Sequence, residues 1–152
     1  MPSSFASPPR AAAPLLLAAT ASAFQIYVAL NPNGANVPGV AAIGHVSPAG
    51  GGVNNKYGLA FAGNNYEWNI TLACADSDND GYPNGWELGD PCGNWTAAAK
   101  ILPTWNTDIS HPGLRSSVPQ TRKLPLDWSV CGTTNPCAGL ETAASPRQAL
   151  RG

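Results

Sequence analysis

Charged side chains are scarce in this 152-residue sequence, at 11% against a usual share of about 25%. Eight Lys and Arg residues against nine acidic ones leave a net charge of −1, so the basic surplus of a nucleic-acid binder is missing. Long apolar runs are missing too, and no segment reaches the roughly 20 apolar residues that span a bilayer. Sixteen glycines and fifteen prolines interrupt the chain, which excludes a long helical bundle. A small, loop-rich domain remains.

The first 23 residues have the composition of a secretory signal peptide. Arg10 is the only early charge, the run from Ala11 to Ala21 is apolar, and Ala21-Ser22-Ala23 forms a cleavage site before Phe24. We therefore expect a signal peptide over 1–23 and a secreted, extracellular protein.

Secretion makes the four cysteines informative: Cys74, Cys92, Cys131 and Cys137. An even number in an oxidising compartment predicts two disulfides, with three connectivities open. The most local pairing joins Cys74 to Cys92 and Cys131 to Cys137. A four-cysteine zinc site is not favoured, because the sequence has no CxxC pair.

One segment has a helical period: the apolar residues Leu59, Ala62, Tyr66, Ile70 and Ala73 follow at intervals of 3, 4, 4 and 3. This spacing predicts one main helix over about 58–74, leading into an acidic loop. Residues 25–30, 95–105 and 124–130 are predicted as short strands or extended segments. The expected fold is α+β, a small loop-rich single domain with short antiparallel strands, stapled by disulfides.

Five of the nine acidic residues crowd into fifteen positions: Asp76, Asp78, Asp80, Glu87 and Asp90. Residues 76–87 match the calcium-loop pattern D-x-[DN]-x-[DN]-G-x5-E at every fixed position. In that pattern alternate residues and a closing glutamate supply oxygen ligands to one ion. The sequence therefore predicts a Ca²⁺ site formed by Asp76, Asp78, Asp80, the Tyr82 carbonyl, Asn84 and Glu87.

Two features argue against a calmodulin-like switch. Pro83 lacks the backbone N–H that a paired loop would require, and the chain has a single loop of this type. A structural, extracellular-type site with a Kd of about 10⁻⁴–10⁻³ M fits better.

The chain has only two histidines, His45 and His111, each in a motif with glycine or proline, and Asp108 precedes the second. Two imidazoles and a carboxylate could form a transition-metal site if these segments meet in space. Two separate histidines are the other reading. A shared metal site at His45 and His111 would allow an alternative function, that of a metal-dependent, copper-like redox or oxygen-handling protein.

No catalytic residue is predicted. The neighbours Ser110 and His111 do not form a nucleophile–base pair by themselves, and no nucleophile elbow is present. Most carboxylates are assigned to calcium, which favours a binding module over an enzyme. Asn69 and Asn94 each begin an N-glycosylation sequon, so a glycoprotein is expected in a eukaryotic secretory route.

Several motifs occur in a recognisable order between Asn33 and Gly113. They include Pro32-Asn33-Gly34, Gly44-His45, residues 56–61 (KYGLAF), residues 72–74 (LAC), the acidic loop, residues 87–92 (ELGDPC) and residues 110–113 (SHPG). In this order they resemble the temptin-domain family. The resemblance implies a secreted, disulfide-linked domain over 24–114 that acts through protein contacts. An extension over 115–140 with a Cys131–Cys137 loop and a flexible tail over 141–152 would follow it.

The resemblance and the loop together suggest a secreted temptin-like calcium-binding module. It would act in extracellular protein or peptide interaction or signalling, in a pheromone-complex-like role. The expected partner is a secreted protein or peptide, with no nucleic acid and no membrane span.

Overall fold

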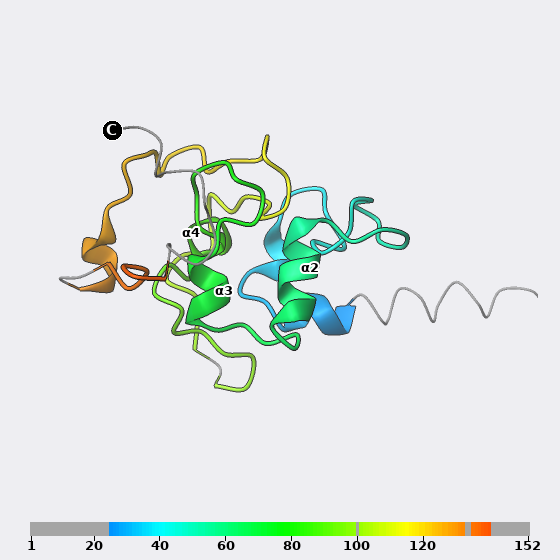
Figure 1. The fold of residues 1–152 in the computed structure, drawn as a ribbon, viewed down its shortest axis with the longest axis horizontal. Helices are drawn as coiled ribbons and strands as arrows, with labels where there is room; N and C mark the ends of the chain where they lie inside the picture. The colour runs from blue at the N-terminus through cyan, green and yellow to red at the C-terminus, as the bar shows by residue number, and fades with distance from the viewer. Residues whose placement is uncertain (1–24, 100, 133–134, 141–152) are drawn as a thin grey trace, which may run out of the picture.

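The computed structural model describes residues 25–99, 101–132 and 135–140, so the signal peptide predicted over 1–23 and the tail over 141–152 lie outside the described residues. The chain forms short helices joined by long loops (Figure 1): η1 (Gly34–Asn36), α2 (Lys56–Gly63), α3 (Ile70–Cys74), α4 (Asn84–Leu88) and η2 (Trp128–Cys131). Residues 25–29 are also helical. None of the helices in the described part is long and apolar enough to cross a membrane.

The single helix predicted over about 58–74 is wrong, because two helices, α2 and α3, occupy this stretch. The α2 helix ends where Asn65 and Tyr66 adopt left-handed φ values of 54° and 58°. The Tyr66 N–H then donates to the Phe61 carbonyl, a bond typical of a helix C-terminus. A new helix starts where the Asn69 side chain accepts a hydrogen bond from the Leu72 N–H. The spacing of apolar residues does not reveal this break between α2 and α3.

The predicted β part of the fold is also wrong. No strand forms among the described residues, and antiparallel pairing is limited to one isolated bridge between His45 and Asn54. Of the segments expected as strands, residues 25–29 are helical and the third contains the start of η2. A strand needs a partner to satisfy its backbone, and the frequent Gly and Pro residues break possible partners. The small, loop-rich domain is confirmed.

The core lies between the three α-helices and the loop that precedes α2. Its buried side chains are Val37, Ile43, Tyr57, Phe61, Trp68, Leu72, Ala73 and Leu88. The α3 and α4 helices pack against each other. Gly85 permits this approach, because a Cβ there would lie 3.2 Å from the Ala73 Cβ and 2.5 Å from the Asp90 carbonyl oxygen. The α3–α4 pair therefore holds both ends of the acidic loop.

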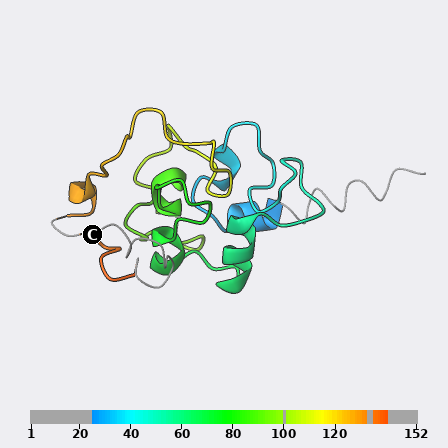
Figure 2. The same cartoon turned by 45° about the horizontal axis from the view of Figure 1, so that its top comes forward.

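The two disulfides tie the end of α3 and the loop after α4 to the C-terminal extension. Cys74 pairs with Cys137 and Cys92 with Cys131, over 63 and 39 residues of sequence. The local pairing, and with it the Cys131–Cys137 loop, is wrong. The acidic loop is already closed by α3 packing on α4. The cysteines instead hold the extension, whose end (orange) lies across α3 and α4 from α2 (Figures 1 and 2). Closing loops of these lengths contributes about 4 kcal/mol each in the chain-entropy model.

Candidate metal centre

The acidic loop is anchored by Asn84, the first residue of α4. Its backbone N–H donates to the Ala75 carbonyl at 2.8 Å, and its side-chain amide donates to the Leu72 carbonyl at 2.8 Å. Its carboxamide oxygen accepts from the Ser77 N–H at 3.3 Å. Asn84 is fully buried and joins the last turn of α3 to α4. The residue predicted as the ninth-position ligand therefore also holds the loop closed.

Asp76 curls the loop around its own carboxylate. One oxygen accepts from the backbone N–H groups of Asn79 and Asp80 at 2.8 and 3.2 Å, and the other from Gly81 at 3.0 Å. The curl requires left-handed backbone at Asn79 (φ 64°) and Gly81 (φ 100°). This is the sharp turn for which the sequence pattern places glycine at its sixth position.

The loop brings three carboxylates together. Ligand atoms of Asp76, Asp78 and Asp80 lie within 4.8 Å of one another, and this is the one such group of three or more metal-capable side chains among the described residues. The Asp80 Oδ1 atom accepts from the Tyr82 N–H at 2.8 Å, and its Oδ2 atom has no partner. Glu87 falls outside this group of three.

Several buried carboxylate oxygens in and beside this group have no hydrogen-bond partner. They are both oxygens of Asp78, the Oδ2 atom of Asp80 and the Oε2 atom of Glu87. Asp78 is 6% exposed and Glu87 is 0% exposed. Burying unpaired carboxylates is costly unless they bind a cation or take up protons. The chemistry of this donor set, all oxygen and strongly acidic, fits a hard divalent cation.

Electrostatics point the same way. Burial and the neighbouring Asp80 and Asp76 carboxylates raise the pKa of Asp78 to about 7. Burial, together with the charges of Asp78 and Asp80, raises the pKa of Glu87 to about 10. Without a cation these groups repel one another and retain protons, so a bound cation would replace protons here.

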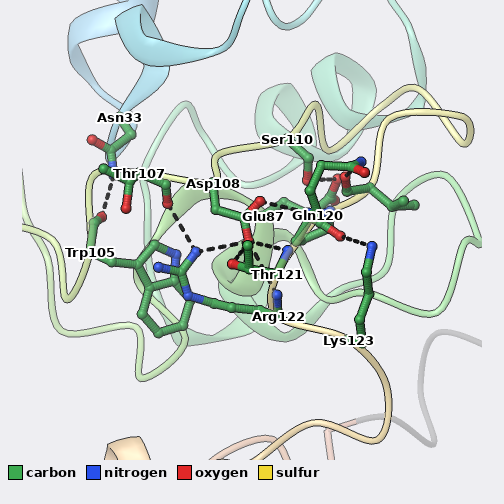
Figure 3. A network of polar contacts seen from close by, with 12 residues as sticks. Asn33, Glu87, Trp105, Thr107, Asp108, Ser110, Gln120, Thr121, Arg122 and Lys123 are labelled. Atoms are coloured by element: carbon green, nitrogen blue, oxygen red, sulfur yellow. Dashed lines mark hydrogen bonds and ion pairs between the residues drawn. The ribbon is translucent and has the colours of Figure 1, made fainter.

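Ser110 holds Glu87 from a distant part of the sequence (Figure 3). The Ser110 hydroxyl donates to the Oε1 atom of Glu87 at 2.9 Å, and the Ser110 N–H donates to the Glu87 carbonyl at 3.1 Å. Sequence reasoning missed this contact, because 23 residues separate the two and no local pattern links them. The segment carrying His111 is thereby fixed to the last residue of the calcium pattern.

The Asp90 carboxylate is fully occupied by hydrogen bonds from the protein. Its carboxylate accepts from the Trp68 indole N–H at 2.7 Å and from the backbone N–H groups of Asn94 and Trp95 at 3.1 and 3.0 Å. It connects the segment before α3 to the loop after α4, which is a structural role.

The two histidine segments meet at Asn55, the cap of α2. The Asn55 amide donates to the carbonyls of Ile43 and His45, and Gly113 packs so closely that a Cβ there would lie 2.7 Å from the Asn55 carboxamide. The His111 Nδ1 atom accepts from the Gly113 N–H at 3.0 Å, which assigns the proton of the neutral ring to Nε2. Burial lowers the pKa of His111.

Asp108 does not join the histidines. Its carboxylate accepts hydrogen bonds from the Gln120, Thr121 and Arg122 backbone and from the Thr121 hydroxyl (Figure 3). Burial alone would raise the pKa of Asp108, but these bonds lower it to about 2. His45, His111 and Asp108 form no second group of metal-capable atoms within 4.8 Å in the part of the chain that the structure describes.

Comparison with known proteins identifies the chain's relatives. The family described as Temptin C-terminal matches residues 21–114. Temptin from Aplysia californica is 39% identical over 105 residues, which cover 64% of this chain and 82% of that protein. The chain belongs to the temptin family. The family resemblance drawn from the ordered motifs is thus confirmed, while no solved structure matches the chain.

The temptin match contains the whole acidic loop, Ser110 and both histidines. It ends before Cys131 and Cys137, each of which completes one of the two disulfides. In this temptin-family chain, the helix pair that flanks the loop is therefore braced by residues outside the part matched to the family.

Proposed function

We propose that this protein is a secreted temptin-family module that binds Ca²⁺ at residues 76–87 and contacts a protein or peptide partner outside the cell. The role would be in extracellular signalling of a pheromone-complex type. Family membership supports the class of protein, and the acidic loop supports the ion.

The single observation that carries the calcium part is the set of buried, unpartnered oxygens on Asp78, Asp80 and Glu87. A solvated acidic turn would leave such oxygens in water, whereas here they are withdrawn from it. A cation would satisfy them together. Asp76 and the Tyr82 carbonyl would complete the shell, and Asn84 would ligate directly or through water at the ninth position.

The ligand atoms of the loop and the helix pair that holds its ends favour calcium over other ions. Oxygen-only donors disfavour zinc and copper, and Mg²⁺ usually keeps several waters and is bound by only one or two carboxylates. Because α3 and α4 hold the loop ends, the ion would brace existing structure rather than open a groove. This arrangement fits an affinity of about 10⁻⁴–10⁻³ M.

Calcium titration of chelated protein tests the proposal. We expect added Ca²⁺ to raise the melting temperature and to change tryptophan fluorescence, since Trp86 directly precedes Glu87. Asp78→Asn should abolish both responses, while the matched control Glu67→Gln, at an exposed site outside the loop, should keep them. Absence of both responses in the wild type would refute the calcium site.

Secretion is supported by the two disulfides, which persist in oxidising compartments. Expression of the full chain in a secreting host should release a protein whose first residue is Phe24. N-terminal mass spectrometry decides the point, and retention of residues 1–23 in the released protein would contradict it.

A transition-metal protein is the second candidate, and one observation favours it: the segments of His45 and His111 are both packed on Asn55. Two others oppose it, since Asp108 is bound elsewhere and the His111 Nδ1 atom is occupied. Elemental analysis of the purified protein and of His45→Ala and His111→Ala distinguishes the candidates. Copper that is present in the wild type and lost from both variants would support the transition-metal protein.

A further inference from the structure

A cleft of about 240 Å³ lies between residues 27–31 and α2, and none of its lining residues belongs to the acidic loop. The segment that contains residues 27–31 (blue) and α2 lie side by side in both views (Figures 1 and 2). Four aromatic side chains contribute to its wall: Tyr27, Tyr57, Phe61 and Tyr66. Neither the calcium site nor the family match accounts for this cleft.

The floor of the cleft is built from backbone. Gly44 and Gly58 both line it, and a Cβ on Gly58 would lie 2.0 Å from the Gly44 carbonyl oxygen. Only glycine permits α2 to lie this close to the 44 segment. Tyr57 next to it is fully buried. The floor is therefore preformed, which reduces the cost of ordering the site when a ligand binds.

The mouth of the cleft is formed by two exposed aromatic rings. Tyr27 and Tyr66 are each 45% exposed, and their ring centroids lie 4.9 Å apart. Tyr66 also meets Phe61 edge to face at 5.6 Å. It does so from a left-handed backbone at φ 58°, a conformation that bulky residues rarely adopt. The turn after α2 thus places a large ring in the lining at a position where glycine would suit the backbone better.

The chemistry of the wall restricts the ligand. The lining contains no Asp, Glu, Lys or Arg. Its polar side-chain groups are those of His45, Asn54 and Asn31 and the tyrosine hydroxyls. The Asn31 carboxamide is already bonded to the Tyr57 hydroxyl and the Tyr27 carbonyl. A charged ligand would lose its hydration without gaining an ion pair from an Asp, Glu, Lys or Arg side chain. A flat, apolar ligand would instead stack on the aromatic wall.

The volume of the cleft indicates the size of ligand that it can hold. An apolar cavity of about 150 Å³ holds benzene, so about 240 Å³ admits one ring or two fused rings. We propose that this cleft is a binding site for a small, uncharged aromatic molecule of that size. This inference is independent of calcium.

Titration of ¹⁵N-labelled protein, with calcium present throughout, tests the site. We expect indole and benzamide to shift the amide signals of the lining residues with millimolar affinity. Benzoate, the charged counterpart of benzamide, should bind at least about tenfold more weakly because the wall offers no lysine or arginine to pair with it. Failure of indole to shift these signals at its solubility limit would overturn the proposal. Equal binding of benzoate and benzamide would overturn it too.

Two variants assign the binding to this cleft. Tyr66→Gly removes the ring at the mouth while suiting the backbone, and should weaken indole binding about two- to tenfold. Val28→Trp should fill the cleft and abolish binding. The control Leu59→Ala on α2 is 62% exposed and outside the lining, and should bind as the wild type does. Unchanged binding in Tyr66→Gly and a folded Val28→Trp would refute the site.

A tryptophan side chain in a peptide carries the same ring as indole, and one further ligand distinguishes this source from a free small molecule. N-acetyl-tryptophanamide carries the indole group within peptide bonds. If it binds no better than indole, the free small molecule is supported. If it binds at least about tenfold more tightly, the cleft accepts an aromatic side chain of a peptide, and the small-molecule assignment is overturned.

Discussion

Ser110 binds Glu87 twice, with its hydroxyl on the carboxylate at 2.9 Å and its backbone N–H on the carbonyl at 3.1 Å. Both residues are almost fully buried. The pair joins the closing position of the acidic loop to the segment that carries His111. A change at Ser110 should therefore affect a site that lies 23 residues away in the sequence.

Ser110→Ala should destabilise the protein by about 1–3 kcal/mol, since it leaves a second buried Glu87 oxygen unpartnered. It should also shift the calcium midpoint to higher concentration, because Glu87 loses the contact that orients it. Thermal unfolding with and without calcium measures both effects. Ser116→Ala, at an exposed position of the same segment, is the control. A Ser110→Ala protein with a wild-type calcium midpoint would show that the contact does not orient the ligand.

The disulfide pairing makes a prediction that proteolysis can check without any mutation. Trypsin cuts after Lys56, Lys100, Lys123 and Arg147, giving one peptide (57–100) with two cysteines and another (124–147) with the other two. The pairing of the structure links these peptides covalently, whereas the local pairing would release them separately. Nonreducing mass spectrometry should find the linked species, and reduction should separate it.

Removing the shorter crosslink tests its contribution to stability. Cys92→Ser combined with Cys131→Ser should lower the free energy of unfolding by about 4 kcal/mol, the value for a loop of 39 residues in the chain-entropy model. Denaturant unfolding measures the loss. The extension should become sensitive to protease while residues 56–99 stay protected. Equal protection of the extension in both proteins would contradict its dependence on this crosslink.

The sequence predicted what is local and missed what is distant. The calcium pattern lies within twelve consecutive residues, and the structure brings its first three carboxylates together. The Cys74–Cys137 pairing spans 63 residues, and no spacing rule selects it. The break between α2 and α3 depends on the backbone of Asn65 and Tyr66, which an apolar period does not reveal. Strand propensity at residues 25–29 was overridden because no partner strand exists among the described residues.

The two glycosylation sequons should differ in use. Asn94 is exposed, whereas Asn69 is partly buried and caps α3 through the Leu72 N–H. In a eukaryotic secretory host, Asn94→Gln should remove the glycan and leave the melting temperature almost unchanged. Asn69→Gln should leave the glycan mass unchanged and destabilise by about 1 kcal/mol through loss of the cap. Intact mass and thermal unfolding check both. A glycan lost on Asn69→Gln would reverse the assignment.

Asp108 should make stability depend on pH in the acid range. Its pKa in the folded protein, lowered to about 2, lies below the usual value near 3.8, so the unfolded chain binds the proton more readily. The stabilisation is therefore complete above about pH 4 and is lost as the pH falls towards 2. Asp108→Asn should be less stable than the wild type at neutral pH, because its amide cannot accept as many backbone hydrogen bonds. The difference in unfolding free energy between Asp108→Asn and the wild type should narrow steadily below pH 4.

Asp127 supplies a matched control, since its exposed carboxylate has one hydrogen-bonding residue, Ser129, which lowers its pKa, against the three residues that bond to Asp108. Urea unfolding of both asparagine variants at closely spaced pH values separates the two positions. We expect Asp127→Asn to follow the wild-type pH profile far more closely than Asp108→Asn does. A constant gap between Asp108→Asn and the wild type from pH 7 to pH 2 would mean that the substitution acts through packing and not through the charge.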